Sequence, residues 1–214
     1  MKTIACLHTA GTNVAVFDAA CPPGVTLRHT VNEALLKDAE AAGGLTEAIA
    51  QRTARALEEL AAPGVDAVLL TCSTVGPGVA LARAAVPVLR VDAALAEAAT
   101  RGGGRVVVLC AVETTMEPSR KVFEEPAARH GATLEVRLVP GAWAAFRGGD
   151  VASYHRLVAE AAEAAFAEGA AEVALAQASM AGAVAMAIGR KPLASPPVGL
   201  AAAVACGGGR DTDP

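Results

Sequence analysis

Gly64-Val65-Asp66-Ala67-Val68-Leu69-Leu70-Thr71-Cys72-Ser73-Thr74 is the stretch that decides the fold. The run from Val65 to Leu70 is apolar, follows the turn residues Pro63-Gly64, and stops at a polar group that carries a thiol. A short apolar run between turn signals predicts a buried strand. Open α/β sheets bind ligands at the carboxyl ends of their strands, so Cys72 is a candidate reactive thiol. A small buried cysteine at a strand end is the alternative interpretation.

Helices and strands alternate on both sides of this stretch. Thr46 to Ala61 has apolar residues at three- and four-residue spacing, with Thr46 placed to cap the helix. Further strands are predicted at 2–7, 86–91, 105–110, 133–139 and 173–180, and further helices at 32–41, 78–85, 93–100, 118–130 and 151–168. This order predicts parallel sheets with helices on their faces. Residues 14–30 are interpreted as an irregular strand or loop, and residues 140–150 as a loop.

The composition argues against several classes of protein. A net charge of −4 and an aromatic content of 3% leave no basic stripe with interleaved aromatics, which argues against a nucleic-acid partner. The apolar fraction of 53% argues against disorder. The longest uncharged apolar stretch, residues 173–189, contains Gln177, Ser179 and two glycines. We interpret it as a buried strand and helix and expect no membrane span.

The five cysteines predict a reducing cytoplasm and no metal site. They form no C-x-x-C pair and no ligand spacing with the four histidines, and the first residues do not resemble a signal peptide. Cys6 and Cys110 lie in apolar runs and are expected in the core. Cys21 and Cys206 lie beside proline or glycine and are expected in loops, with residues 206–214 as a flexible tail.

Two halves of the chain repeat one plan. A polar edge at His8-Thr9 precedes a helix and the run from Asp66 to Cys72, and Thr114-Thr115 precedes a helix and the run from Glu172 to Ser179. The predicted fold class is α/β, with two pseudo-symmetric αβα subdomains that each hold a mainly parallel sheet. We expect residues 1–95 in the first, with 196–214 packing back on it, and residues 96–195 in the second. Polar edges would line the cleft between them. The alternative is the alternation common to all α/β proteins.

Three short motifs carry a family resemblance: Leu69-Leu70-Thr71-Cys72-Ser73-Thr74, Thr114-Thr115-Met116-Glu117-Pro118 and Leu175-Ala176-Gln177-Ala178-Ser179-Met180-Ala181. They resemble the first catalytic strand edge, the Thr-Thr turn and the second catalytic edge of the aspartate/glutamate/hydantoin racemase superfamily. The resemblance spans nearly the whole chain. It implies two α/β subdomains related by a pseudo-dyad, an active site between them, and neither cofactor nor metal. It also implies that one cysteine removes the α-proton of a small carboxylate and a second returns one.

The resemblance implies roles for ten residues. Hydroxyl groups and backbone amides would stabilise the enediolate charge, and the imidazole of His8 could polarise a carboxylate or simply be hydrogen-bonded at its strand end. The catalytic candidates are Cys72, Ser179 and Gln177, and the substrate-binding candidates are His8, Thr9, Ser73, Thr74, Thr114, Thr115 and Met180.

The second thiol of the family is missing from the second edge. Anchoring that edge on Met180 places Gln177 at the cysteine position, whereas pairing Glu172 with Asp66 places Ala178 there. Neither a glutamine nor an unassisted serine matches a thiol as an acid or base for an α-proton.

Two classes of function therefore remain open. The first is a cofactor-independent racemase or isomerase that acts on a small carboxylate or amino-acid derivative through Cys72, with a single-thiol decarboxylase of the arylmalonate type or a cis-trans isomerase as variants. The second is a binding protein that holds a small acid without turnover. A generic nucleotide-binding domain is less favoured, because no Gly-x-Gly-x-x-Gly pattern or P-loop lysine is found. The Ala-rich helices predict a homodimer or larger oligomer.

Overall fold

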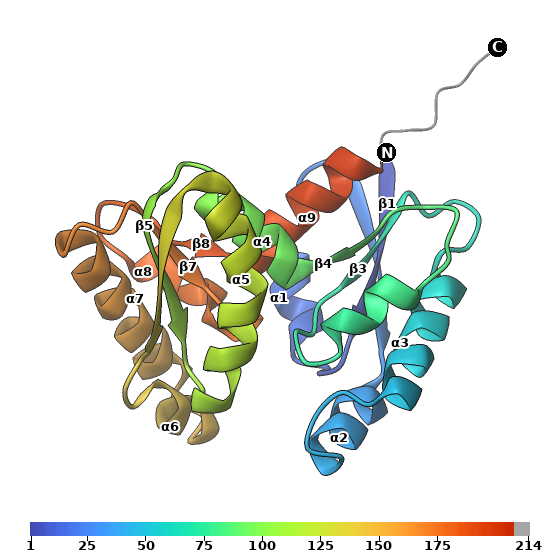
Figure 1. The fold of residues 1–214 in the computed structure, drawn as a ribbon, viewed down its shortest axis with the longest axis horizontal. Coiled ribbons are helices and arrows are strands. Elements are labelled where there is room, and N and C mark those ends of the chain that lie inside the picture. Colours follow the sequence, from blue (N-terminus) through green and yellow to red (C-terminus); the bar gives the residue numbers. More distant parts are fainter. Residues whose placement is uncertain (208–214) are drawn as a thin grey trace. The chain divides into compact units, whose positions relative to one another are not determined.

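The structure is a computed structural model that describes residues 1–207 and divides into two compact units. One unit comprises Met1–Val91 and the segment that begins at Pro196, and the other comprises Asp92–Ser195. Each unit holds one four-stranded sheet whose strand pairs are all parallel (Figure 1). The predicted α/β class, with two subdomains built from parallel sheets and flanking helices, is confirmed.

The first unit has the strand order β2-β1-β3-β4. Figure 1 shows α2 and α3 together on one side of this sheet. The elements, in chain order, are β1 (Lys2–His8), α1 (Asn13–Ala19), β2 (Val25–Val31), α2 (Glu33–Ala41), α3 (Glu47–Leu60), β3 (Ala67–Leu70), the 3-10 helix η1 (Gly76–Leu81), β4 (Val88–Arg90) and, from the end of the chain, α9 (Ser195–Cys206).

Different helices pack on the two faces of the first sheet. Ala5 and Leu7 of β1 pack in one buried cluster with Leu57 of α3, together with alternate residues of β3. Thr46 caps α3 as predicted, because its Oγ1 accepts a hydrogen bond from Ile49 N at 3.4 Å. Since successive side chains of a strand point to opposite faces, the even-numbered residues of β1 belong to the other face.

Helix α9 packs on that other face so closely that a glycine is required. A Cβ atom at Gly199 would lie 2.6 Å from Val91 Cγ2 and 3.5 Å from Leu69 Cδ2. Lys2 Nζ also donates a hydrogen bond to Val204 O at 2.5 Å, which ties α9 to the start of β1. The prediction of a loop at Cys206 is wrong, because this residue ends α9. The rest of the predicted tail, residues 208–214, lies outside the described residues.

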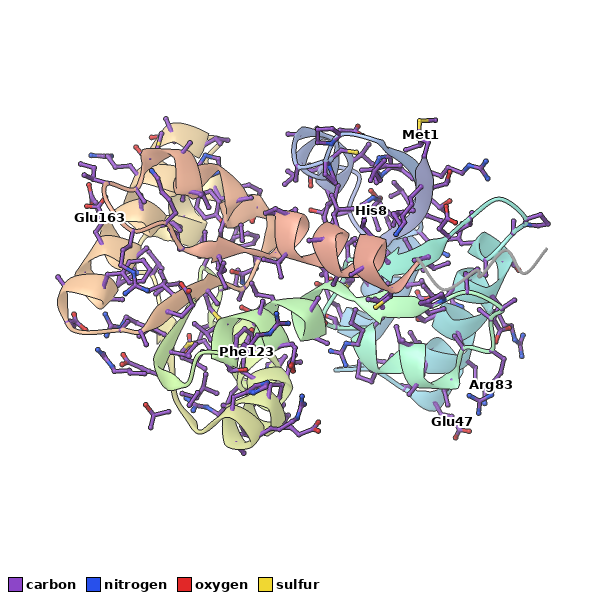
Figure 2. The ribbon with its side chains drawn as sticks, turned by 90° about the horizontal axis from the view of Figure 1, so that it is seen from above. Met1, His8, Glu47, Arg83, Phe123 and Glu163 are labelled. Atoms are coloured by element: carbon purple, nitrogen blue, oxygen red, sulfur yellow. The ribbon has the colours of Figure 1, made fainter. Side chains whose placement is uncertain are left out.

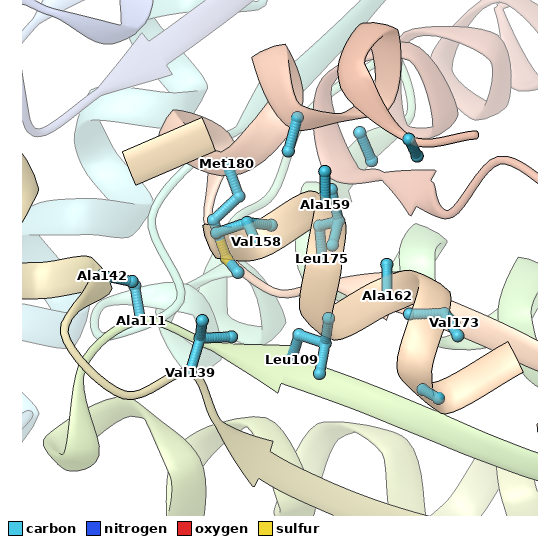
Figure 3. Packing of buried hydrophobic residues seen from close by; sticks show 14 of the residues in the cluster. Leu109, Ala111, Val139, Ala142, Val158, Ala159, Ala162, Val173, Leu175 and Met180 are labelled. Atoms are coloured by element: carbon cyan, nitrogen blue, oxygen red, sulfur yellow. The ribbon is translucent and has the colours of Figure 1, made fainter. Parts of the chain in front are cut away.

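The second unit repeats the topology, with the strand order β6-β5-β7-β8. Its core joins β5 and β7 to α7, and Figure 3 shows Leu109 and Leu175 of this cluster with Val158 and Ala162 of α7. The elements, in chain order, are α4 (Val91–Thr100), β5 (Gly104–Cys110), the 3-10 helix η2 (Glu113–Thr115), α5 (Met116–His130), β6 (Ala132–Leu138), α6 (Ala142–Arg147), α7 (Val151–Ala167), β7 (Glu172–Leu175), the 3-10 helix η3 (Ala178–Gly182), α8 (Ala183–Met186) and β8 (Leu193–Ala194).

Three segments differ from the sequence predictions. Residues 14–30 form α1 and β2, because the Pro-Pro-Gly turn that suggested a loop only separates a seven-residue helix from a regular edge strand. Residues 140–150 contain the short helix α6, in which the ring of Trp143 stacks on that of Phe146. The helix predicted at 78–85 is the 3-10 helix η1 and begins two residues earlier. Within residues 1–207, none of the helices is long and apolar enough to cross a membrane.

Candidate functional site

The first strand edge is the polar turn that follows β3, residues Thr71 to Thr74. Thr71 N donates to Leu7 O at 3.0 Å, which extends the β1–β3 ladder by one residue. Gly76 N donates to Ser73 O at 3.1 Å and closes a tight turn. Cys72 and Ser73 are partly buried and Thr74 is exposed. Cys72 therefore comes directly after the last residue that the ladder holds, and the three side chains Cys72, Ser73 and Thr74 form one short segment.

The five thiols have very different surroundings. Cys6 and Cys110 are fully buried, and burial raises the pKa of both thiols, that of Cys6 to about 12. Cys110 Sγ also donates to Ser119 Oγ at 3.7 Å. Cys72 is only partly buried, although it packs against the core cluster of α2 and α3. Of the cysteines in the described chain, Cys72 is the partly exposed one at the carboxyl end of a central strand.

His8, the last residue of β1, lies inside the first unit and is fully buried (Figure 2). Its Nδ1 lies 2.9 Å from Thr71 Oγ1, and its Nε2 lies 2.8 Å from Nδ1 of His29. Burial, reinforced by His29, lowers the pKa of His8 to about 4. Thr9 is buried as well. The structure thus gives His8 a hydrogen-bonded place at its strand end, which was the second of the two interpretations.

The second strand edge, residues Ala176 to Met180, is held by the side chain of Gln177. Gln177 Oε1 accepts from Ala111 N at 2.9 Å, and Gln177 Nε2 donates to Thr115 Oγ1 at 2.6 Å. Thr115 Oγ1 in turn donates to Val112 O at 2.7 Å. Both ends of the amide are therefore used to join the end of β7 to the turn after β5, where Thr114 is exposed and Thr115 partly buried.

Ser179 is held by two neighbours that the sequence pattern did not single out. Its Oγ lies 2.8 Å from the hydroxyl oxygen of Tyr154, and its carbonyl oxygen accepts from Nε2 of His155 at 2.9 Å. Tyr154 is fully buried, and burial raises the pKa of its phenol to about 12. The sequence predicted the helix that carries Tyr154 but not that the hydroxyl of Tyr154 reaches η3.

Met180 lies in the core of the second unit. It is fully buried and belongs to the cluster formed by β5, β7 and α7, where Figure 3 shows it beside Val158. An apolar side chain buried in this way packs η3 onto α7. This position argues against the direct substrate contact that the resemblance implied for Met180.

The strand ladders show which positions of the two units correspond. Leu7 of β1 pairs with Leu70 of β3, and Leu109 of β5 pairs with Leu175 of β7. The strands β1 and β5 both have seven residues, and the first residue of each is paired with the first residue of the edge strand beside it, β2 or β6. The next residue donates to the same carbonyl in each unit: Ala176 N to Leu109 O at 3.0 Å, as Thr71 N does to Leu7 O.

Thr71 of the first unit therefore corresponds to Ala176 of the second, and the residues that follow them, Cys72 and Gln177, correspond as well. Two residues further on, Thr74 corresponds to Ser179. This is the register anchored on Met180. The alternative register, which pairs Asp66 with Glu172, is wrong by one residue, because the ladder matches Glu172 with Ala67.

The first unit also contains a group of potential metal ligands that the sequence spacing did not predict. Cys6, His8 and His29 each offer one ligand atom, and these atoms all lie within 4.8 Å of one another. His29 is the ladder partner of Cys6 on β2. The sequence has no metal-ligand spacing for this group, because the pairing of β1 with β2 brings His29 beside Cys6 from 23 residues away along the chain.

The comparisons agree with this architecture. Residues 9–204 match the family model described as Asp/Glu/Hydantoin racemase. No curated protein is similar enough in sequence to count as a relative.

Solved structures of similar fold cover nearly the whole chain. Picrophilus torridus aspartate racemase has a TM-score of 0.71 at 12% identity, covering 97% of this chain and 95% of its own. Allantoin racemase from Klebsiella pneumoniae has a TM-score of 0.70 at 16% identity, covering 96% and 87%. Unliganded arylmalonate decarboxylase has a TM-score of 0.63 at 16% identity, covering 99% and 95%. At these identities the likeness establishes the fold.

Proposed function

Because the chain belongs to the Asp/Glu/hydantoin racemase family, we propose that it is a cofactor-independent enzyme of the racemase and isomerase type that transfers a proton at the α-carbon of a small carboxylate or amino-acid derivative. Cys72 is the group that donates or removes this proton. The observation that carries the proposal is its position: a partly exposed thiol two residues beyond the end of β3, on the segment that resembles the first catalytic edge of the family.

The proposed chemistry needs a base and a set of hydrogen-bond donors. Removing an α-proton places negative charge on the carboxylate, and donors directed at that charge lower the barrier. Ser73 and Thr74 follow Cys72 and offer hydroxyl groups on the same segment. We assign them to the substrate carboxylate. In the second unit Thr114 is exposed, whereas the hydroxyl of Thr115 is already bonded to Gln177 and Val112 O.

The residue that corresponds to Cys72 in the second unit restricts the type of reaction. Gln177 has no titratable proton, and both ends of its amide are engaged within the second unit. This favours a reaction in which a thiol acts on one face of the substrate carbon. It disfavours the exchange of protons between two thiols, and it assigns Gln177 and Ser179 to holding the second edge in place.

Decarboxylation of a substituted malonate is the second candidate that this observation favours. In that reaction the C–C bond to one carboxylate breaks, its electron pair forms an enediolate as carbon dioxide leaves, and one thiol proton then reprotonates the α-carbon. Arylmalonate decarboxylase is among the structures of similar fold. A cis-trans isomerase, in which the thiolate adds to a double bond and leaves after rotation, also needs one thiol.

Proton exchange in heavy water tests the proposal. The purified chain and its Cys72→Ala variant are incubated in D₂O with amino acids, hydantoins and substituted malonates, and deuterium at the α-carbon is followed by NMR. The proposal predicts Cys72-dependent incorporation on at least one substrate. Release of carbon dioxide with one deuterium delivered would identify the decarboxylase.

The proposal is overturned if no substrate is converted in a way that depends on Cys72. If no substrate shows incorporation, carbon dioxide release or cis-trans conversion that depends on Cys72, thiol catalysis is excluded. Binding of a small acid without conversion would then identify a binding protein. Cys206→Ala is the matched control, because Cys206 is an exposed thiol at the end of α9.

We place the enzyme in a reducing cytoplasm as a homo-oligomer. All five cysteines, which lie in the described part of the chain, are free thiols. Size-exclusion chromatography with light scattering tests the oligomeric state.

A further inference from the structure

The group formed by Cys6, His8 and His29 is built into the regular part of the first sheet. Cys6 and His8 are two residues apart on β1 and therefore point to the same face. His29 of β2 is paired with Cys6 in the parallel ladder. Cys6 and His8 are fully buried, and the side chain of His29 is 15% exposed. Two adjacent strands thus fix the positions of all three side chains.

The hydrogen bonds around the two imidazoles direct one nitrogen of each ring inward. The outer nitrogens face oxygen atoms: His8 Nδ1 lies 2.9 Å from Thr71 Oγ1, and His29 Nε2 lies 3.0 Å from Asp18 Oδ1. Thr71 Oγ1 also lies 3.2 Å from Leu7 O, to which it can donate its own hydrogen, and in that arrangement it accepts from His8 Nδ1. The Asp18 carboxylate accepts from His29 Nε2.

In the tautomer that has both outer nitrogens protonated, two lone pairs face each other. With both outer nitrogens protonated, His8 Nε2 and His29 Nδ1 each present a lone pair, and they lie 2.8 Å apart. Two lone pairs at this distance repel unless a cation lies between them. The cation can be a shared proton or a metal ion, and the Sγ atom of Cys6 lies within 4.8 Å of both nitrogens.

We propose that Cys6, His8 and His29 form a zinc-binding site in the first unit, with a water molecule as the fourth ligand. Tetrahedral zinc bound by one thiolate and two imidazoles places its ligand atoms roughly 3.3–3.7 Å apart. The nitrogen pair must open by about half an ångström and the thiol must move closer by up to about an ångström. Rotations of the three side chains provide such movements without a change in the strands.

The surroundings suit a divalent ion of intermediate softness. A thiolate with imidazoles selects zinc over calcium or magnesium, which prefer oxygen ligands. Asp18 fixes the outer nitrogen of His29 as the carboxylate of a carboxylate–histidine–zinc arrangement does. The charges of the Cys6 thiolate and the Asp18 carboxylate together balance the two positive charges of the ion. On binding, the Sγ–H bond of Cys6 breaks, its electron pair forms the Zn–S bond, and the proton leaves to solvent.

Cobalt(II) is the spectroscopic probe for this site. The chain is treated with a chelator, freed of it and titrated with Co²⁺. We expect saturation at one equivalent, with a thiolate-to-cobalt charge-transfer band in the near ultraviolet and the visible bands of tetrahedral cobalt. Zinc should displace the cobalt and abolish both signals. The Cys6→Ser variant should lose the charge-transfer band, whereas Cys206→Ser and Cys72→Ser should keep it.

Two further variants keep the test valid if Cys6→Ser does not fold. His29→Ala changes a partly exposed side chain on an edge strand, so it should fold and yet bind zinc weakly. Zinc should raise the melting temperature of the wild-type chain but not of this variant. Asp18→Asn should weaken zinc binding by about 10- to 100-fold, because it removes the carboxylate that orients His29.

Three results would overturn the proposal. The first is the absence of stoichiometric binding by the wild-type chain. The second is a charge-transfer band that survives in a folded Cys6→Ser variant. The third is a band that disappears in Cys72→Ser, which would place the metal on the reactive thiol.

Discussion

The two units put different side chains at corresponding positions of the same ladder. At the end of β3, Cys72 is a partly exposed thiol in a turn closed by a hydrogen bond between backbone atoms. At the end of β7, Gln177 uses both ends of its amide to hold the turn after β5. The Cys72 thiol is therefore available for a reaction, whereas the Gln177 side chain maintains the structure of its own edge.

The same contrast holds for the next pair of corresponding positions. Thr74 is exposed, whereas Ser179 is held by the hydroxyl of buried Tyr154 and by His155. A fold that places two equivalent edges therefore does not give them equivalent roles. Substitutions of these four residues, and of Tyr154 beside Ser179, test the contrast.

The largest effect is expected from Cys72→Ala. Removing a general acid or base typically lowers a rate about 10²- to 10⁴-fold, so deuterium incorporation or carbon dioxide release should fall by that factor. The free energy of unfolding should change little, because Cys72 is only partly buried. Cys206→Ala should retain the full rate. A Cys72→Ala variant with wild-type turnover would show that the first edge is not the reactive one.

Tyr154 should titrate as a phenol kept neutral by burial. It is the single tyrosine of the chain, so tyrosinate absorbance reports it alone, with an expected pKa of about 12 in the folded state against 10 for an ordinary phenol. Because the folded pKa is raised, this group stabilises the fold below pH 10 and loses that contribution as the pH rises toward 12. Tyr154→Phe should lack this alkaline loss. A titration near 10 before unfolding would contradict the buried position.

Gln177→Ala should destabilise the second unit. It leaves Ala111 N without its acceptor and removes the donor to Thr115 Oγ1. Unpaired buried polar groups cost about 1–3 kcal/mol, which urea unfolding would detect as a lower midpoint with an unchanged slope. The catalytic rate of the folded variant should fall less than that of Cys72→Ala. A loss of activity as large as that of Cys72→Ala, without any loss of stability, would make Gln177 a direct participant.

The smallest effects are expected at the pair Ser179 and Thr74. Ser179→Ala removes the hydrogen bond to Tyr154 and should cost about 0.5–1.5 kcal/mol of the free energy of unfolding. Thr74→Ala changes an exposed side chain and should stay within about 0.5 kcal/mol of the wild type. Urea unfolding of both variants compares the two edges directly. Equal effects at the two positions would remove the contrast between them.

The parallel sheets were predictable because apolar strand runs and the helix from Thr46 are strong local signals. The α-helix α1 and strand β2 were missed because β2 is an edge strand whose alternate residues are exposed, so its apolar signal is weak. Missing β2 also hid the pairing of His29 with Cys6, which depends on a ladder between strands.

The candidate site was predictable only in part for the same reason. The polar residues after Leu70 are enough to predict, from the sequence alone, that the strand ends near Cys72. The register of the second edge depends on which residues face each other across β5 and β7, and only the ladder distinguishes Gln177 from Ala178 as the counterpart of Cys72. The contact of Tyr154 with Ser179 likewise depends on how α7 packs against η3.

The most direct test of the one-thiol account is the configuration of the deuterium label. A substrate that shows Cys72-dependent turnover is converted in D₂O by the wild-type chain, and the configuration of the newly labelled α-carbon is measured at early conversion. The account predicts that the wild-type chain delivers deuterium to one face, because a single thiol, that of Cys72, supplies it. Wild-type delivery to both faces at equal rates would contradict it.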